Sequence, residues 1–357
     1  MTATLDNLKQ FDTLIDVRSP AEFAEDHIPG AINCPVLDDA QRAQVGTLYK
    51  QVSPFEARKV GAALVSENIA RHLREQFMDR PKSWRPLIYC WRGGQRSGAM
   101  TIVFRQIGWG AQQLEGGYKA YRRHVLSTLD TLPSDFHYQV IGGATGSGKS
   151  RILHALADRG AQVLDLEHLA AHKGSVLGVL PGTGQPSQKT FDSQLLQRLQ
   201  EFDPARPVFV EAESRKVGNL HLPDTLIACM RRSPCITVAA PMPARVAFLL
   251  RDYAYFVQDT DWLIRRLDTL RNLRGNDIVN HWIDLARQGS WEHFVQELLE
   301  KHYDPLYHRS QSTNYAAYSS PLVVQAQDLS TSDIGRLADA ILGAIPPCPA
   351  TPLQPGP

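Results

Sequence analysis

Two short glycine-containing segments carry residues that could do chemistry. In the segment CWRGGQRS, Cys90 and Arg96 are separated by five residues. A thiolate at this position could lie inside a ring of backbone N–H groups with arginine charge close by. The segment GATGSGKS, residues 143–150, has the pattern of a loop that surrounds a di- or triphosphate. Together the two segments predict chemistry that uses both a chalcogen and a phosphate ester.

In the first segment, Cys90 is the candidate nucleophile. A thiol of pKa about 8.5 becomes reactive near neutral pH when a helix N-terminus and nearby cations stabilise its anion. The apolar run at residues 86–90 predicts a strand ending at Cys90, and helical spacing resumes near residue 96. Arg92 and Arg96 are its candidate catalytic partners, and Arg96 could bind an oxyanion through a charge-assisted contact. The candidate anion-binding residues of this loop are Gly93, Gly94, Gln95, Arg96 and Ser97.

The second segment matches the phosphate-loop pattern in the context that its mechanism requires. A strand is predicted before it and a helix after it. Backbone N–H groups would hold phosphate oxygens, Lys149 would neutralise them and Ser150 could bind Mg²⁺. The pattern does not distinguish a nucleotide from another diphosphate ester. The candidate diphosphate-binding residues are Gly143, Thr145, Gly146, Ser147, Gly148, Lys149 and Ser150.

Acidic residues follow two later strands of the same predicted sheet. Asp165 ends one strand, and Glu211 and Glu213 end another. Because ligands of such sheets bind at the carboxyl ends of the strands, these acids could hold a metal ion or orient a substrate. The alternative is that they cap helices or lie at a solvated edge. Arg245 and Arg251 could close over a phosphate, although surface arginines are the more common case.

Strands that alternate with helices predict an α/β protein with doubly wound parallel sheets. We expect an N-terminal domain at residues 1–130 with a helical insertion at 38–78, a phosphate-loop domain at 131–345 with a helical C-terminal part, and a disordered proline-rich tail at 346–357. The linker between the domains is expected at 131–135. Strands are expected at 13–17, 31–36, 86–90, 137–143, 161–166, 207–213, 235–240 and 321–327. A short helix followed by a turn is expected at 21–30, and a turn followed by a helix at 114–126. Further helices are expected at 96–109, 150–160, 188–202, 222–232 and 243–257, over most of 261–307, and from about Ser330 or Ser332.

The composition excludes several classes of protein. The chain has 357 residues, of which 43% are hydrophobic and 21% charged, which is typical of proteins that fold in water. The N-terminus shows no basic segment followed by an apolar run, and no stretch approaches the roughly 20 apolar residues of a membrane span. We therefore expect a cytoplasmic protein. A net charge of +1 predicts no general attraction to nucleic acid. The five cysteines are Cys34, Cys90, Cys229, Cys235 and Cys348. Their scattered positions without CxxC spacing argue against a disulfide framework or a zinc site built from them, so reduced thiols are expected.

The N-terminal segments resemble the rhodanese domain. The resemblance rests on DVRSPAEFAEDHIPGAINCPV, on Cys90 at the end of a strand and on LEGGYKAY, and it covers about residues 5–128. The Cys90 loop is one residue longer than in sulfur-transferring rhodaneses and has the spacing of cysteine-dependent phosphatases. This length suits a tetrahedral, phosphate-like group. It fits a phosphate-bearing chalcogen donor and a phosphatase equally well, and Cys34 is expected to be a packing residue.

Segments outside the two loops extend the resemblance over nearly the whole chain. VGTLYKQVSPFEARKVG, DLEHLAAHKGSVLG, QPSQKTFD, VEAESRKVG and HYDPLY, together with the domain order, resemble the bacterial tRNA 2-selenouridine synthase family. The resemblance implies a transferase that acts on the wobble 2-thiouridine of Lys, Glu and Gln tRNAs. In that family, sulfur is geranylated from geranyl diphosphate and then replaced by selenium from selenophosphate. No covalently bound cofactor is implied, Mg²⁺ is an option, and an enzyme that supplies selenophosphate is an expected partner.

The resemblance also implies a division of labour between the loops. Gly148, Lys149 and Ser150 would bind the prenyl diphosphate, and the Cys90 loop would receive or deliver selenium from selenophosphate. Tyr118 and Tyr121 could stack on bases. Basic residues that could contact RNA, or simply be solvated, are Lys119, Arg122, Arg123, Arg231, Arg232 and those within 265–274.

Three alternatives remain open from the sequence. The first is an ATP-dependent sulfurtransferase that delivers sulfur from a Cys90 persulfide. The second is a cysteine phosphatase fused to a kinase-like module. The third is a phosphate-binding sensor without activity, which the retained Cys90 disfavours.

Overall fold

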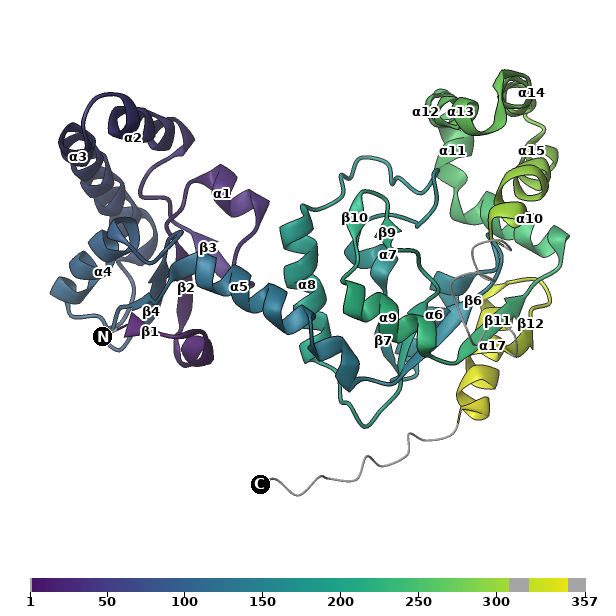
Figure 1. Ribbon diagram of the computed structural model, residues 1–357, viewed down its shortest axis with the longest axis horizontal. Coiled ribbons are helices and arrows are strands. Elements are labelled where there is room, and N and C mark those ends of the chain that lie inside the picture. The colour runs from purple at the N-terminus through teal and green to yellow at the C-terminus, as the bar shows by residue number, and fades with distance from the viewer. Residues whose placement is uncertain (1, 308–320, 346–357) are drawn as a thin grey trace. The chain divides into compact units, whose positions relative to one another are not determined.

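The computed structural model describes residues 2–307 and 321–345 of the chain (Figure 1). The chain divides into two units. The first contains Met1–Thr128 and also Pro186–Leu196, and the second contains Leu129–Gln185 and the chain from Gln197 onward. Residues 131–135, expected as a linker, form the short helix η3 (Leu132–Asp135) with Pro133 buried. The expected disordered tail lies outside the described residues.

The first unit is built on a parallel sheet whose strands lie in the order β1-β5-β4-β2-β3. Every residue of β4, the strand that leads to Cys90, is buried. Such a strand is expected where helices cover both faces of a parallel sheet. The strands are β1 (Thr2–Ala3), β2 (Thr13–Asp16), β3 (Ala31–Asn33), β4 (Pro86–Tyr89) and β5 (Gln112–Leu114). The two-residue strand β1 was not predicted.

The helices of the first unit include the predicted insertion. They are η1 (Leu5–Gln10), α1 (Pro20–Glu25), α2 (Asp39–Gln51), α3 (Pro54–His72), η2 (Leu73–Phe77), α4 (Gln95–Ile107) and α5 (Gly117–Leu129). Asp38 begins α2 by accepting a 2.7 Å hydrogen bond from the Gln41 N–H, and the Gln41 side chain accepts one from the Asp38 N–H. A Cβ at Gly61 of α3 would lie 3.4 Å from Val45 of α2, so glycine allows the two helices to pack closely (Figure 1).

The second unit is built on another parallel sheet, with the strands in the order β12-β11-β6-β8-β7. The strand before the phosphate loop, β6, is therefore central. The strands are β6 (Tyr138–Gly142), β7 (Gln162–Leu164), β8 (Val208–Glu211), β11 (Cys235–Ala239) and β12 (Leu322–Gln325). Both units are thus α/β with parallel sheets, as predicted. A small antiparallel pair, β9 (Lys216–Val217) and β10 (Leu220–His221), was not predicted.

Helices that pack on this sheet, and a further helical part, complete the second unit. They are α6 (Lys149–Asp158), α7 (Leu166–Leu169), α8 (Gln188–Gln200, whose first part groups with the first unit), α9 (Asp224–Arg232), α10 (Met242–Asp252), α11 (Ala254–Gln258), α12 (Thr260–Leu267), η4 (Asp268–Leu270), α13 (Arg271–Arg274), α14 (Asn276–Arg287), α15 (Trp291–Leu298), η5 (Leu299–Tyr303) and α17 (Thr331–Ala344). The segment expected to be mostly helical, 261–307, is helical. Ser330 caps α17 at the predicted position.

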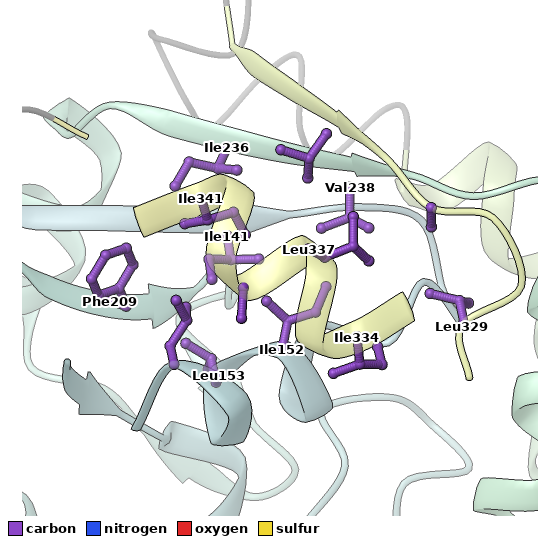
Figure 2. Packing of buried hydrophobic residues seen from close by; sticks show 14 of the residues in the cluster. Ile141, Ile152, Leu153, Phe209, Ile236, Val238, Leu329, Ile334, Leu337 and Ile341 are labelled. Carbon is purple, nitrogen blue, oxygen red and sulfur yellow. The ribbon is translucent and has the colours of Figure 1, made fainter. Parts of the chain in front are cut away.

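The main core of the second unit holds the phosphate-loop helix against the sheet. Ile152 and Leu153 of α6 and Leu337 of α17 are fully buried, and Figure 2 shows them packed beside Ile141 and Ile236 of the strands. Fully burying a side chain of this size contributes about 1.5–3 kcal/mol. The N-terminus of α6, which begins at Lys149, is therefore held firmly at the carboxyl end of β6.

Candidate functional site

Cys90 lies directly after β4, where its sulfur faces the N-terminus of α4. The side chain is only 4% exposed. The N–H of Gly94, the residue that caps α4, donates to Cys90 Sγ at 3.3 Å, and the Ser97 hydroxyl donates to it at 3.2 Å. Donors at a helix N-terminus stabilise a thiolate. The structure therefore places Gly94 and Ser97 at the sulfur, while Gln95 and Arg92 are exposed.

Arg96 is held by a residue that the sequence analysis did not identify. Its guanidinium donates to Glu22 Oε2 at 2.7 Å and to Glu22 Oε1 at 3.3 Å. Burial alone would raise the pKa of Glu22, but the hydrogen bond and charge of Arg96 outweigh it and lower the pKa. Glu22 thus sets the position of the Arg96 side chain. The only sequence signal is Glu22 three residues after Ser19, which marks it as a helix-capping residue.

A second loop fixes the backbone around Cys90. Gln113 donates to the Gly94 carbonyl at 2.9 Å and to the Ser97 hydroxyl at 2.8 Å. The N–H of Tyr118 donates to the Cys90 carbonyl at 2.8 Å. These contacts hold the thiol loop in one conformation, and sequence reasoning missed Gln113 because a lone glutamine carries no motif.

Cys34 is a packing residue, as expected. It is fully buried in the core of the first unit, and its thiol donates to Gln76 Oε1 at 3.4 Å. Burial raises the pKa of the Cys34 thiol to about 12. Cys34 is therefore protonated and unreactive at neutral pH.

Gly117→Ala is expected to destabilise the protein more than Gly30→Ala. Both residues have positive φ, +56° and +80°, so both variants strain the backbone by about 1 kcal/mol. A Cβ at Gly117 would also overlap the Cys90 carbonyl oxygen, whereas a Cβ at Gly30 would meet nothing. We expect Gly117→Ala to lower the free energy of unfolding by about 2 kcal/mol or more in urea denaturation. Equal effects of the two changes would contradict the close contact of the two loops.

The phosphate loop adopts the conformation that its pattern predicts. Gly146 and Gly148 have φ of +83° and +76°, and Gly148 caps α6. The Ser147 side chain is 1% exposed, and its hydroxyl has no hydrogen-bond partner among the described residues. A buried hydroxyl without a partner is unfavourable unless a ligand satisfies it. Lys149 Nζ lies 3.0 Å from the Gly143 carbonyl oxygen, at the same loop.

Three glutamates gather beside this loop. Oxygen atoms of Glu167, Glu211 and Glu213 lie within 4.8 Å of one another, and Ser150 donates to Glu167 Oε2 at 3.1 Å. Glu211 Oε1 is buried without a hydrogen-bond partner among the described residues. Burial and mutual repulsion raise the pKa of Glu167 to about 9 and that of Glu213 to about 8, and burial raises the pKa of Glu211. Carboxylate and hydroxyl oxygens are the ligands that Mg²⁺ prefers, so these residues could hold that ion.

The structure changes the assignment of one predicted acid. Asp165 caps α7 by accepting from the His168 N–H at 2.8 Å, and its other oxygen lies 2.8 Å from His154 Nε2. It fills the capping role, and Glu167 takes the place beside Glu211 and Glu213. Glu167 lies within a helical turn and not at a strand end, so its spacing carried no signal.

The two predicted phosphate-closing arginines have other partners. Arg245 is buried, donates to the Thr145 carbonyl at 2.9 Å and pairs with Asp304 at 2.5 Å. Arg245 therefore holds the backbone of the phosphate loop at Thr145. Arg251 is exposed and donates to the Leu329 carbonyl at 3.1 Å. The expectation that these arginines close over a phosphate is not met in this conformation.

The phosphate loop opens into a cavity of about 660 Å³, which the three glutamates also line. A smaller pocket of about 60 Å³ adjoins it, and apolar side chains make up most of its lining, including Leu249, Phe256, Phe294 and Leu298. Both cavities are lined by Thr145, Ser175, Leu249, Tyr253 and Tyr303. The anion-binding cavity and the apolar pocket therefore adjoin each other, with these five residues between them.

His302 gives the second unit an acid-sensitive element. Arg274 Nε donates to His302 Nδ1 at 2.8 Å, and burial together with the Arg274 charge lowers the pKa of this histidine to about 4. An unfolded histidine binds its proton near pH 6.5. Because the folded pKa is lower, the stability that His302 contributes is present above pH 6.5 and is lost as the pH falls toward 4.

The His302→Asn variant should therefore be less sensitive to acid than the wild type. The asparagine oxygen can replace Nδ1 as the acceptor for Arg274 without binding a proton. Between pH 7 and pH 4.5, we expect the wild type to lose more free energy of unfolding than the variant, by at most about 3 kcal/mol. Urea denaturation at both pH values measures this difference, with the exposed His124→Asn variant as the control. Parallel loss in wild type and His302→Asn would refute it.

The residues proposed to contact RNA differ in their exposure. Tyr118 and Tyr121 are 1% and 6% exposed, so the expectation that they stack on bases is wrong. The Tyr118 hydroxyl instead donates to Asp26 at 2.7 Å. Arg122 is paired with Asp192. The exposed basic side chains of the predicted set include Lys119, Arg123, Arg232 and Arg265.

Comparison with known proteins identifies both units. A model of the rhodanese-like domain matches residues 2–124, and a model of the tRNA 2-selenouridine synthase AAA domain matches residues 136–268. No helix within residues 2–307 and 321–345 is long and apolar enough to span a bilayer.

Curated relatives named tRNA 2-selenouridine synthase match most of the chain. The relative from Nitrosomonas europaea is 39% identical over 67% of this chain and 63% of its own length, so the chain spans less than two thirds of that relative. Relatives from Marinobacter nauticus and Aeromonas salmonicida are 32% and 33% identical, each over 82% of this chain and over 87% and 86% of their own lengths. With the thiol loop on one α/β unit and the phosphate loop on the other, the chain belongs to the tRNA 2-selenouridine synthase family.

Proposed function

We propose that this protein converts wobble 2-thiouridine in tRNA into 2-selenouridine in two steps. In the first step, sulfur is geranylated from geranyl diphosphate. In the second step, selenium from selenophosphate replaces the alkylated sulfur. The substrates are tRNAs of the Lys, Glu and Gln type, and an enzyme that makes selenophosphate is the expected supplier. Membership of the synthase family supports the overall conversion.

The observation that carries the first step is that the apolar pocket adjoins the phosphate-loop cavity. A prenyl diphosphate has an anionic end and an apolar end in the same order. The diphosphate would lie against the N–H groups of residues 145–149, with Lys149 neutralising its charge. The apolar pocket is smaller than a whole geranyl chain, so we expect part of the chain to lie along Leu249 and Tyr253. Mg²⁺, if bound at Ser150 and the glutamates, would help to neutralise the negative charge of the leaving diphosphate.

Alkylation of the sulfur makes the second step easier. A thione sulfur leaves C2 of the uracil ring with difficulty, whereas an S-alkyl group leaves as a thiol. Alkylation also makes C2 more electrophilic, so two moderate steps replace one difficult step. The selenium of selenophosphate forms a bond to C2 while the C2–S bond breaks and the sulfur departs as geranyl thiol. Water then cleaves the P–Se bond, and phosphate leaves.

The second step is assigned to the Cys90 loop. Its Gly94 N–H and Ser97 hydroxyl donate to the sulfur, and Arg96 on the same loop is paired with Glu22. Such a group of donors and charge suits a tetrahedral selenophosphate next to a thiolate. Cys90, Arg92 and Arg96 are the proposed catalytic residues, with Gly93, Gly94, Gln95 and Ser97 completing the anion site.

A reconstituted assay tests the proposal. Purified protein is incubated with 2-thiouridine tRNA, geranyl diphosphate and selenophosphate, and the nucleosides are analysed by mass spectrometry. We expect S-geranyl-2-thiouridine when selenophosphate is omitted and 2-selenouridine when it is present. Absence of both products would refute the proposal. Dependence on ATP would favour a sulfurtransferase, and phosphate release from aryl phosphates would favour a phosphatase.

Val257→Trp should weaken binding of the prenyl chain without weakening binding of diphosphate. Val257 lines the apolar pocket and is 39% exposed, so a larger side chain can enter the pocket without disturbing the core. We expect KM for geranyl diphosphate to rise about tenfold, which corresponds to the burial of one or two methylene groups. Pyrophosphate lacks the prenyl chain, so its Ki should change by less than about twofold, which is close to the error of the measurement. The matched control is Leu273→Trp at an exposed leucine outside the pocket, and equal effects of the two variants would argue against a chain-binding role.

A further inference from the structure

A group of metal-ligating side chains lies on the helical part of the second unit, and the proposed function does not use it. His293 and Glu297 are four residues apart on α15, so they lie on the same face of that helix. His281 comes from the neighbouring helix α14 (Figure 1). One ligand atom from each residue lies within 4.8 Å of the other two.

Two separations between ligand atoms of this group are close to those in a zinc site. His281 Nε2 lies 3.3 Å from Glu297 Oε2, and His293 Nε2 lies 3.4 Å from Glu297 Oε1. In a tetrahedral site with bonds of about 2.0–2.1 Å, neighbouring ligand atoms are about 3.3–3.4 Å apart. Each histidine faces a different oxygen of Glu297, so side-chain rotations are needed to bring all three residues onto one ion.

The Glu297 carboxylate gives an independent reason to expect a cation. Its Oε2 atom is buried and accepts no hydrogen bond from the described residues, although the side chain as a whole is 15% exposed. Its Oε1 atom lies 2.7 Å from Lys301 Nζ, whereas Oε2 faces His281 Nε2 at 3.3 Å without a hydrogen bond. A buried carboxylate oxygen without a hydrogen bond is unfavourable, and an ion bound between Oε2 and the histidine would remove this penalty. Both histidines are half exposed or more, so an ion can reach them from solvent.

We propose that His281, His293 and Glu297 bind one divalent transition-metal ion of the zinc class, with water as the fourth ligand. Two imidazoles and a carboxylate suit zinc, whereas Mg²⁺ and Ca²⁺ prefer sites made only of oxygen atoms. The ion would join α14 to α15. Because Phe294, Val295 and Leu298 on α15 line the apolar pocket, the ion would stabilise one wall of that pocket. This site is separate from the thiol chemistry of Cys90.

Zinc titration of the full-length protein tests the site. We compare the wild type with the His281→Ala/His293→Ala double variant, and we use the exposed His124→Ala variant as the control. Cysteine thiols also bind zinc, so the measured quantity is the difference in stoichiometry between variants. We expect the double variant to bind one Zn²⁺ fewer than the wild type and the control. Zinc should also raise Tm of the wild type and the control by more than that of the double variant.

A Lys301→Ala variant provides a test in the opposite direction. Lys301 competes with the ion for Glu297 Oε1, so its removal should tighten zinc binding by about tenfold, the effect of roughly one charge-assisted contact. A variant that merely damaged the fold would weaken binding instead. Equal zinc stoichiometry in the wild type and the double histidine variant, or weaker binding by Lys301→Ala, would overturn the proposal.

Discussion

Cys90→Ala is expected to block selenium incorporation while leaving geranylation intact. The thiol loop and the phosphate loop belong to different α/β units, and the donors around Cys90 Sγ come from the thiol loop itself. Formation of 2-selenouridine should fall by about 10²-fold or more, the effect of removing one essential transition-state contact. S-geranyl-2-thiouridine should accumulate at close to the wild-type rate. Nucleoside mass spectrometry of the reconstituted reaction measures both products.

Cys34→Ala is the matched control for this prediction. Cys34 lies in the same unit, but its thiol is buried in the core and has a raised pKa. Its removal should lower stability slightly and leave the ratio of the two products unchanged. If Cys90→Ala instead abolished geranylation as well, the proposed division of labour between the loops would be wrong.

Lys149→Ala is expected to have the complementary effect. Lys149 begins α6 and is the cation of the phosphate loop, so its loss removes the charge that would stabilise the departing diphosphate. We expect geranylation to fall by about 10²-fold or more. Selenation of tRNA that already carries S-geranyl-2-thiouridine should proceed at a rate within about twofold of the wild type, since a variant outside a step leaves its transition state unchanged.

Assaying Lys149→Ala with tRNA that is already geranylated separates a loss of geranylation from a loss of folding. A misfolded Lys149→Ala protein would fail with both substrates, whereas the proposal requires failure with only one. Lys82→Ala, a change at an exposed lysine in the first unit, is the control for loss of a positive charge. Normal geranylation by Lys149→Ala would exclude the phosphate loop as the prenyl diphosphate site.

The sequence by itself determined the parts of the site that lie within one continuous segment. Gly146, Gly148 and Lys149 form the predicted loop because the strand, the glycines and the helix that shape it are adjacent in the chain. The same holds for Cys90 and for Gly94 at the start of α4. In such loops, backbone sterics and helix capping act between near neighbours, so spacing alone predicts the geometry.

Only the tertiary structure decided which distant residues complete the two loops. Glu22 meets Arg96 although 74 positions separate them. Glu167 joins Glu211 because α7, which follows β7, begins at the same end of the sheet as the end of the neighbouring parallel strand β8. Tyr118 has an aromatic ring that could stack on a base, yet folding buries it against Asp26. Burial and long-range pairing depend on how the helices pack over the sheets, and periodicity indicates which face of a helix is apolar without indicating its neighbour. The apolar pocket beside the phosphate loop is therefore a property of the folded chain alone, because its walls combine helices of residues 242–303 with loop residues at Thr145, Ser175 and Leu177.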